Sequence, residues 1–259
     1  MAADGLLVVA DLHKRFGGVS AVSGASMVIP EGAIVGLIGP NGAGKSSLID
    51  LVSGFTRADR GSVRFDGVEI LGKRPDQIAR MGLVRTFQSP REWGGLTVMD
   101  NVLLGGCKWK RESILRTVTS ARRLRREEHA DRDSAREILE RFGLTSVKNE
   151  PAGRLSGGQK RLLEFARIAA ASPRLVILDE PMGGVNPVLG ERIGLAILDF
   201  ATRGSTVVIV EHNLPFIEHT CGVVVVMDLG SVIAEGPFAS LRDDARVVDA
   251  YLGSEDEHV

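Results

Sequence analysis

Residues 33–52 read AIVGLIGPNGAGKSSLIDLV and combine an apolar run, a glycine-rich loop and a helical pattern. The apolar run from Ala33 to Ile38 is typical of a buried strand, and the run from Ser46 to Val52 has a helical pattern. Between them lies GPNGAGKS, residues 39–46, which matches the phosphate-loop pattern. Glycines let backbone amides turn toward a phosphate, and the N-terminus of the following helix adds partial positive charge. The stretch therefore predicts a phosphate-binding loop between a strand and a helix.

Two side chains of the loop have specific chemistry. Lys45 can reach the β and γ phosphates of a nucleotide, and Ser46 can supply a hydroxyl to magnesium. We expect nucleotide contacts from Gly39, Pro40, Asn41, Gly42, Ala43, Gly44, Lys45, Ser46 and Ser47. An ordinary glycine-rich turn is the alternative interpretation. The loop alone does not separate kinases, GTPases, recombinases and transport ATPases, because all of them use the same cradle.

Composition limits the class of protein. The 259 residues include 32 Lys and Arg against 33 Asp and Glu, so a net charge of -1 gives no general attraction to nucleic acid. Apolar runs such as Val223–Met227 are far shorter than the roughly 20 residues that span a bilayer, and Leu6–Ala10 is too short for a secretory signal. Cys107 and Cys221 are widely separated and predict neither a disulfide nor a zinc site. We expect a globular protein of the reducing cytosol.

The order of predicted elements indicates an α/β protein around a largely parallel sheet. Apolar runs broken by glycine and proline predict strands at Leu6–Ala10, Ala25–Ile29, Ala33–Ile38, Ser62–Phe65 and Leu83–Phe87. Thr97 and Asp100 resemble a capping box that opens a helix through Leu104 and a mainly helical insert ending near Gly153. Helices and strands then alternate at Gly157–Ala171, Leu175–Leu178, after Pro187, Thr206–Val210 and Val223–Met227. Asn186 is the expected N-cap before Pro187.

Two adjacent carboxylates end one of these strands. Residues 174–180 read RLVILDE, which places Asp179 and Glu180 where a parallel sheet presents ligands. Asp179 can hold magnesium, and Glu180 can orient or deprotonate the water that attacks a γ-phosphate. The alternative, that both are solvated acids at a strand end, is weakened by the phosphate loop.

A second glycine motif opens the helix after the insert. Residues 155–159 read LSGGQ, so the helix N-terminus and the amides of Gly157 and Gly158 form another anion site. We expect Ser156, Gly157, Gly158 and Gln159 to contact nucleotide. A single chain has no evident use for two such cradles unless one closes over nucleotide held by another copy. The sequence therefore predicts a dimer.

The order of phosphate loop, LSGGQ and paired acids resembles the ATP-binding cassette (ABC) ATPases over nearly the whole chain. The resemblance implies a Mg²⁺-dependent ATPase with ATP as its ligand and three further site residues. Gln88, after the strand Leu83–Phe87, would sense magnesium and the attacking water. His212, after Thr206–Val210, would contact the γ-phosphate, and Phe16 in KRFGG would stack on adenine.

The same resemblance implies a fold and a division into subdomains. The fold is that of a P-loop NTPase of the ABC type, with a RecA-like parallel-sheet core, an antiparallel β subdomain and an inserted helical subdomain. We expect one domain over residues 1–259, with residues 1–88 and 160–237 forming the ATP-binding core and its β subdomain. Residues 89–159 would form the helical signature subdomain, and residues 238–259 a C-terminal helix and tail.

Finer features resemble the ATPase subunits of branched-chain amino-acid importers. These are the Asn186–Pro187 ending in place of the family's usual aspartate, the FGG after Arg15, ARMGLVRTFQ at 79–88 and AYLG at 250–253. The resemblance implies a peripheral subunit on the cytoplasmic face of the membrane, paired with a second, often paralogous ATPase. Its other partners would be two polytopic permeases and, indirectly, an external solute-binding protein, with no nucleic acid.

Three alternatives stay open. The first is that the same motor imports a related solute such as urea or a short amide. The second is a soluble ABC ATPase that does not act in transport. The third is a P-loop kinase, which would leave the LSGGQ motif without a role.

The cation-rich segment from Lys108 to Arg126 has two interpretations. It is either a solvated helix face or a contact with anionic lipid or a permease loop.

Overall fold

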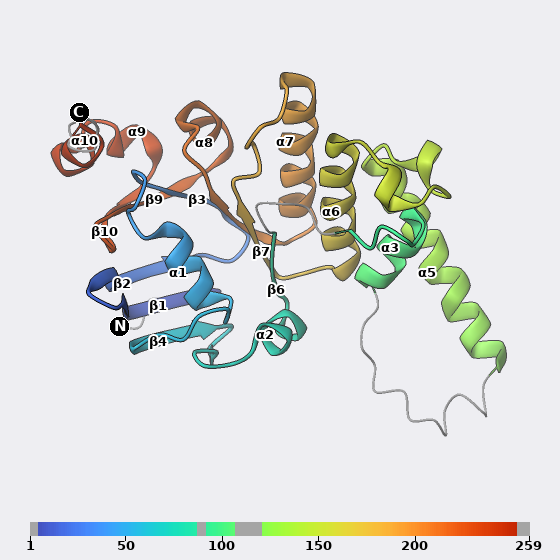
Figure 1. Cartoon of the computed structure of the whole chain (residues 1–259), viewed down its shortest axis with the longest axis horizontal. Coiled ribbons are helices and arrows are strands. Elements are labelled where there is room, and N and C mark those ends of the chain that lie inside the picture. The colour runs from blue at the N-terminus through green and yellow to red at the C-terminus, as the bar shows by residue number, and fades with distance from the viewer. Residues whose placement is uncertain (1–4, 87–91, 107–120, 253–259) are drawn as a thin grey trace. The chain divides into compact units, whose positions relative to one another are not determined.

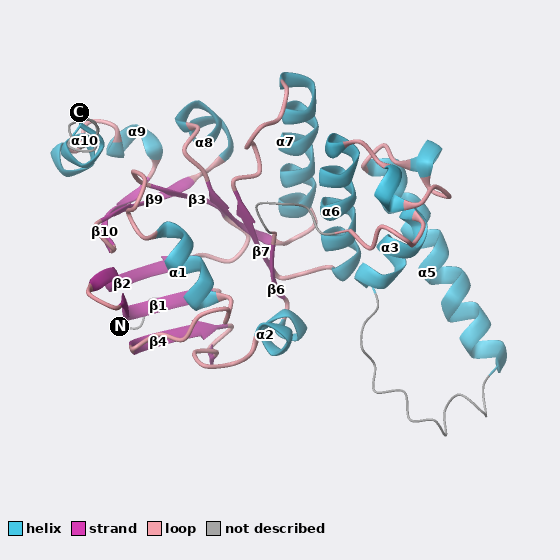
Figure 2. Ribbon diagram, in the orientation of Figure 1, coloured by secondary structure: helices cyan, strands magenta, loops and turns pink. Residues whose placement is uncertain are grey.

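The computed structural model describes residues 5–86, 92–106 and 121–252 and divides the chain into two compact units. The first unit comprises residues 1–88, 174–184 and 197–259, and the second comprises residues 89–173 and 185–196. The long helix α7 (Pro187–Thr202) begins in the second unit and ends in the first. Figures 1 and 2 show these elements.

The first unit contains a six-stranded, mostly parallel sheet of order β10-β9-β3-β8-β7-β6. Strand β3 lies in the middle and pairs in parallel with β8 and β9, whereas β10 runs antiparallel to β9 at the edge. The strands are β3 (Ile34–Ile38), β6 (Leu83–Arg85), β7 (Leu175–Asp179), β8 (Thr206–Val210), β9 (Val223–Asp228) and β10 (Ser231–Gly236). Central strands buried on both faces explain their continuous Val, Ile and Leu runs.

A second sheet of the same unit is antiparallel, with the order β2-β1-β4-β5. Its strands are β1 (Leu7–Phe16), β2 (Val19–Ile29), β4 (Arg60–Phe65) and β5 (Val68–Glu69). Helix α1 (Lys45–Val52) lies between the two sheets (Figure 1). One hydrophobic core connects the two sheets and α1, because Leu12 on β1, Leu48 on α1 and Val225 on β9 belong to one buried cluster. Burying apolar surface stabilises the folded state by about 25 cal/mol per Å². This burial holds α1 in place and therefore also positions the loop that precedes it.

The described residues of the first unit also form the helices α2 (Pro75–Met81), α8 (Leu214–Thr220), α9 (Phe238–Leu241) and α10 (Ala245–Leu252). Helix α2 was not among the expected elements, although its first residue is Pro75 and Gly82, with φ 102°, caps its C-terminus. Its short length gives only one buried apolar residue, Ile78, which is too little for a periodic pattern.

The second unit is helical, with α3 (Val98–Gly106), α5 (Ala121–Arg141) and α6 (Gly157–Ala171). The expected cap of α3 is confirmed, because the amide of Asp100 donates to Thr97 Oγ1 at 3.0 Å. Gly105 allows α3 to approach α6, since a Cβ there would lie 2.6 Å from the carbonyl oxygen of Arg167. All of α6 belongs to the second unit. The boundary expected from the sequence, between residues 159 and 160, lies within the first turn of this helix.

Most expected elements after the insert are confirmed. Helix α6 and strand β8 have the expected bounds, and the amide of Leu189 donates to Asn186 Oδ1 at 2.9 Å, as expected for the N-cap of α7. Strands β1 and β2 are longer than the apolar runs, because the antiparallel pairing continues through polar positions to Phe16 and Val19. Gln88 and residues 107–120 of the cation-rich segment lie outside the described residues.

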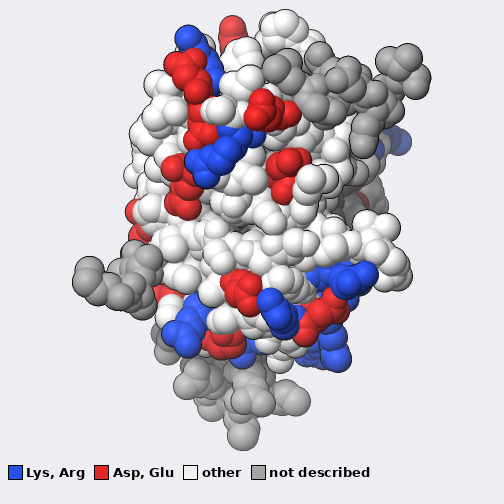
Figure 3. Space-filling model, turned by 90° about the vertical axis from the view of Figure 1, so that its left-hand side faces the viewer, with Lys and Arg blue, Asp and Glu red and all other residues white. Residues whose placement is uncertain are grey.

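Charge is mixed on the face drawn in Figure 3. Acidic and basic side chains of the described residues stand beside one another there. Separately, among the described residues no helix is both long and apolar enough to cross a membrane.

Cys221 is expected to be unreactive in the folded protein. Its side chain is 8% exposed, and burial raises the pKa of the thiol to about 12. Iodoacetamide reacts with the thiolate, so Cys221 should stay unmodified in native protein at pH 8. In urea at about 8 M, a concentration that unfolds most proteins, Cys221 should be alkylated. Peptide mass spectrometry measures both. Equal labelling in the two samples would contradict the buried position.

Candidate nucleotide site

The phosphate loop depends on glycine at positions where the backbone adopts positive φ. Gly39, Gly42 and Gly44 have φ values of 149°, 82° and 95°. A Cβ on Gly39 would collide with the carbonyl oxygen of Met227, and one on Gly44 with that of Ala21. The loop therefore needs glycine for conformation and for space, which leaves its backbone free to form an anion cradle.

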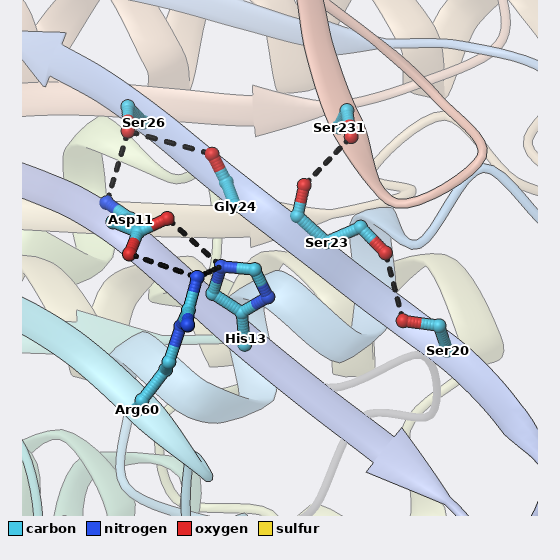
Figure 4. Close-up of polar contacts among 8 residues, drawn as sticks. All are labelled: Asp11, His13, Ser20, Ser23, Gly24, Ser26, Arg60 and Ser231. Carbon is cyan, nitrogen blue, oxygen red and sulfur yellow. Dashed lines mark hydrogen bonds and ion pairs between the residues drawn. The ribbon is translucent and has the colours of Figure 1, made fainter.

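The turn between β9 and β10 supports the loop from behind. The amide of Gly230 donates to the carbonyl oxygen of Ala43 at 3.0 Å, and its own carbonyl accepts from the Ser23 amide at 2.8 Å. Ser231 Oγ donates to the carbonyl oxygen of Ser23 at 2.8 Å (Figure 4). Both sheets thus hold the back of the loop, which keeps it in place for a ligand.

Lys45 lies over the loop that precedes it. Its ammonium group donates to the carbonyl oxygens of Gly39 at 2.7 Å and Pro40 at 2.8 Å. Burial lowers the pKa of Lys45, and the negative charges of Glu180 and Asp179 act in the opposite direction. The half-buried cation of Lys45 therefore lies close enough to the two strand-end acids to feel their charges.

Asp179 ends β7 and is held by two residues of the β6 segment. Arg85 Nη2 donates to Asp179 Oδ2 at 2.9 Å, and the Asp179 amide donates to Thr86 Oγ1 at 3.0 Å. The other terminal nitrogen of Arg85 pairs with Asp50 on α1. The side chains of Arg85 and Asp179 are only 9% and 3% exposed, so this is a buried ion pair.

Glu180 has an unusual backbone conformation. Its φ of 46° lies in the left-handed region, which costs a non-glycine residue on the order of 1–3 kcal/mol. The Glu180 amide donates to the carbonyl oxygen of Val210 at 2.9 Å, and its own carbonyl accepts from the Gly183 amide at 3.1 Å. These main-chain bonds hold Glu180 in this conformation directly after the end of β7.

Three further expected site residues lie on the surface of the first unit, whereas Ala43 of the phosphate loop is buried. His212 follows β8, and its side chain is 70% exposed. Phe16 ends β1, is 51% exposed, and has Lys14 Nζ 5.3 Å from its ring centroid. Ser46 is exposed at the start of α1. All three are available to a ligand, whereas Gln88 lies outside the described residues.

The LSGGQ motif forms the start of α6 in the second unit. Ser156 is its N-cap: the Gln159 amide donates to Ser156 Oγ at 3.3 Å, and the Ser156 amide donates to Gln159 Oε1 at 2.9 Å. This is a reciprocal capping box. Gly157 and Gly158 occupy the first turn, so neither residue places a side chain of its own over the positive end of the helix.

Tyr251 on α10 also reaches the loop. Burial raises the pKa of Tyr251 to about 12, and an interaction of its hydroxyl with the Gly39 backbone acts in the opposite direction. The C-terminal helix therefore contacts the first residue of the phosphate loop. Sequence reasoning named AYLG only as a subgroup feature and missed this contact.

The donor chemistry fits ATP with magnesium. The Ser46 hydroxyl and the Asp179 carboxylate are hard oxygen donors of the kind Mg²⁺ prefers. The glycine positions of the loop have no room for a Cβ at Gly39 or Gly44, as a close phosphate cradle requires. Sequence reasoning missed Arg85, although a cation in the apolar run LVRTF was a signal that it had a buried partner.

Comparison with known proteins decides the family. Residues 22–183 match the family model described as ABC transporter. This chain belongs to the ABC transporter family. It is therefore an ATP-binding and ATP-hydrolysing cassette with the P-loop α/β fold that the sequence predicted. Residues 231–257 also match a model described as branched-chain amino acid ATP-binding cassette transporter.

Relatives of the cassette agree over almost the whole chain. A probable branched-chain amino acid transport ATP-binding protein, LivG, of Archaeoglobus fulgidus is 39% identical, with 98% of each chain covered. The high-affinity branched-chain amino acid transport ATP-binding protein BraF of Pseudomonas aeruginosa is 35% identical, covering 96% of this chain and 98% of BraF. A solved ABC transporter cassette in its ADP conformation superimposes with a TM-score of 0.81 at 34% identity, covering 97% of this chain and all of that one.

Proposed function

We propose that this cassette powers an importer of branched-chain amino acids from the cytoplasmic face of the membrane. The observation that carries the choice of solute is the match of residues 231–257 to the branched-chain transporter model. The proposed assembly has a second ATPase, identical or paralogous, two polytopic permeases and an external binding protein. Solute choice then lies in the permeases and the binding protein, since the described site residues all serve the nucleotide.

In the proposed mechanism, residues 39–47 hold the phosphates through the loop amides and Lys45, while Phe16 stacks on adenine. Ser46, Asp179 and Gln88 would hold Mg²⁺, which would supply positive charge to the phosphates when bound. Ser156, Gly157, Gly158 and Gln159 of the partner subunit close over the γ-phosphate. Each of two ATP molecules is thus sandwiched between two cassettes.

Hydrolysis follows from the acids and the imidazole. The Glu180 carboxylate accepts a proton from the attacking water as the water oxygen bonds to the γ-phosphorus and the bond from that phosphorus to the β–γ bridging oxygen breaks. His212 donates a hydrogen bond to the γ-phosphate, and Gln88 orients the water. Loss of the γ-phosphate removes the charge that bridges the two cassettes, so the cassettes separate. The permeases then return to the conformation that they had before ATP bound.

Reconstitution tests the proposal. The cassette, its permeases and its binding protein are placed in liposomes, and ATPase activity is measured with leucine, isoleucine, valine, urea or acetamide. Branched-chain amino acids should stimulate hydrolysis severalfold and be transported, whereas urea and acetamide should not. If only urea or acetamide stimulated hydrolysis, the proposal that branched-chain amino acids are the solute would be wrong. If the cassette co-purified with no permease, the proposal that it powers a transporter would be wrong.

A further inference from the structure

Glu211 is a buried acid that the mechanism does not yet use. It follows β8, and its backbone amide donates to the carbonyl oxygen of Leu37 on β3 at 3.4 Å. Only 1% of its side chain is exposed, whereas the adjacent His212 side chain is 70% exposed. A carboxylate this deeply buried is costly unless hydrogen bonds satisfy it, so its partners are informative.

The Glu211 side chain accepts hydrogen bonds from two different loops. Its Oε1 accepts from the amide of Met182, two residues after Glu180, at 2.7 Å. Its Oε2 accepts from the amides of His212 at 3.1 Å and Asn213 at 3.4 Å. One carboxylate therefore joins the loop that follows the proposed general base to the loop that carries the exposed imidazole.

We propose that Glu211 is a positioning residue for ATP hydrolysis, fixing the Glu180 loop and the His212 loop relative to each other. The inference rests on the proposed mechanism and extends it. Bonds to a charged acceptor are roughly twice as strong as neutral ones, so the link resists separation of the loops. The link touches neither the phosphate loop nor Lys45 among the contacts described, so nucleotide binding does not depend on it directly.

Glu211→Gln is the informative change. The side chain keeps its size, but one accepting oxygen becomes an amide that donates. Whichever way the amide turns, either the Met182 amide or the two amides at 212 and 213 lose their acceptor. Glu211→Asp keeps two accepting oxygens on a shorter side chain and should retain an intermediate rate. Glu218→Gln on exposed α8 makes the same chemical change away from the link.

The test measures kcat and KM for ATP in the cassette assembled with its permeases. Glu211→Gln should lower kcat about tenfold to 100-fold with KM changed less than about twofold, because small misplacement of reacting groups affects chemistry most. In a His212→Ala background the further loss should be smaller by about threefold or more, as coupled residues require. Glu218→Gln should match wild type.

Three results overturn the inference: an unchanged kcat, a rise in KM as large as the fall in kcat, or losses that multiply independently with His212→Ala. If Glu211→Gln does not fold, Glu211→Asp carries the same measurements. Failure of the proposed function is distinguishable, because the wild-type assembly would then lack solute-stimulated ATPase activity whatever stands at position 211.

Discussion

Glu180→Gln should lower the ATPase rate of the assembled transporter by about 100-fold to 10,000-fold, the usual contribution of a general base. Glutamine keeps the size of the side chain but cannot accept the proton from water at neutral pH. The backbone at 180 should stay in place, because its conformation is held by Val210 and Gly183 through main-chain bonds. ATP should therefore still bind, through Lys45 and the loop amides.

Steady-state phosphate release and equilibrium binding of labelled ATP measure the two halves of this prediction. Glu218→Gln, exposed on α8, is the matched control and should leave both unchanged. A variant at 180 that hydrolyses ATP at the normal rate would remove Glu180 from the chemistry. One that loses ATP binding as well would show that the carboxylate serves mainly to hold the site.

Arg85→Met should destabilise the first unit by about 3–5 kcal/mol, the cost of breaking a buried pair by removing one partner. Arg85 lies between Asp50 on α1 and Asp179 on β7, and the Asp179 side chain is 3% exposed. Without the guanidinium, the Asp179 carboxylate is left buried without its cation. Urea unfolding of the nucleotide-free protein, followed by far-ultraviolet circular dichroism, measures the loss.

Two further variants separate charge from packing. Adding Asp179→Asn to Arg85→Met removes the uncompensated charge and should recover part of the stability, because the destabilisation comes from the charge left behind. Arg80→Met, on exposed α2, removes a surface ion pair and should cost less than about 1 kcal/mol. Equal losses for Arg80→Met and Arg85→Met would show that the buried pair contributes nothing special.

Local patterns predicted the elements that local chemistry specifies. The strand β3, the phosphate loop and α1 follow one another directly, so a single run of residues contains their apolar pattern and glycines. The cap at Asn186 was predictable for the same reason, because its partner Leu189 lies three residues away. Helix α2 and strand β10 were not predicted, since each buries only one apolar residue, Ile78 in α2 and Ala234 in β10, which leaves no periodic apolar pattern.

The site contacts that the sequence did not predict join residues that are far apart in the chain. Arg85 lies 35 residues from Asp50 and 94 from Asp179, so no local pattern pairs them. Glu211 looks from the sequence like a solvated acid at a strand end, and only the fold brings Met182 to it. The roles of Phe16, Gln88, His212 and the LSGGQ residues stay predictions, because they depend on a bound nucleotide and a second cassette.

The contact between Tyr251 and Gly39 has a practical meaning for domain exchange. The segment that distinguishes the branched-chain subgroup, residues 231–257, includes α10 and therefore the side chain that reaches the phosphate loop. A chimera that grafts this segment from another cassette also replaces the neighbour of Gly39. A truncation within α10 therefore also removes a side chain that lies beside the phosphate loop.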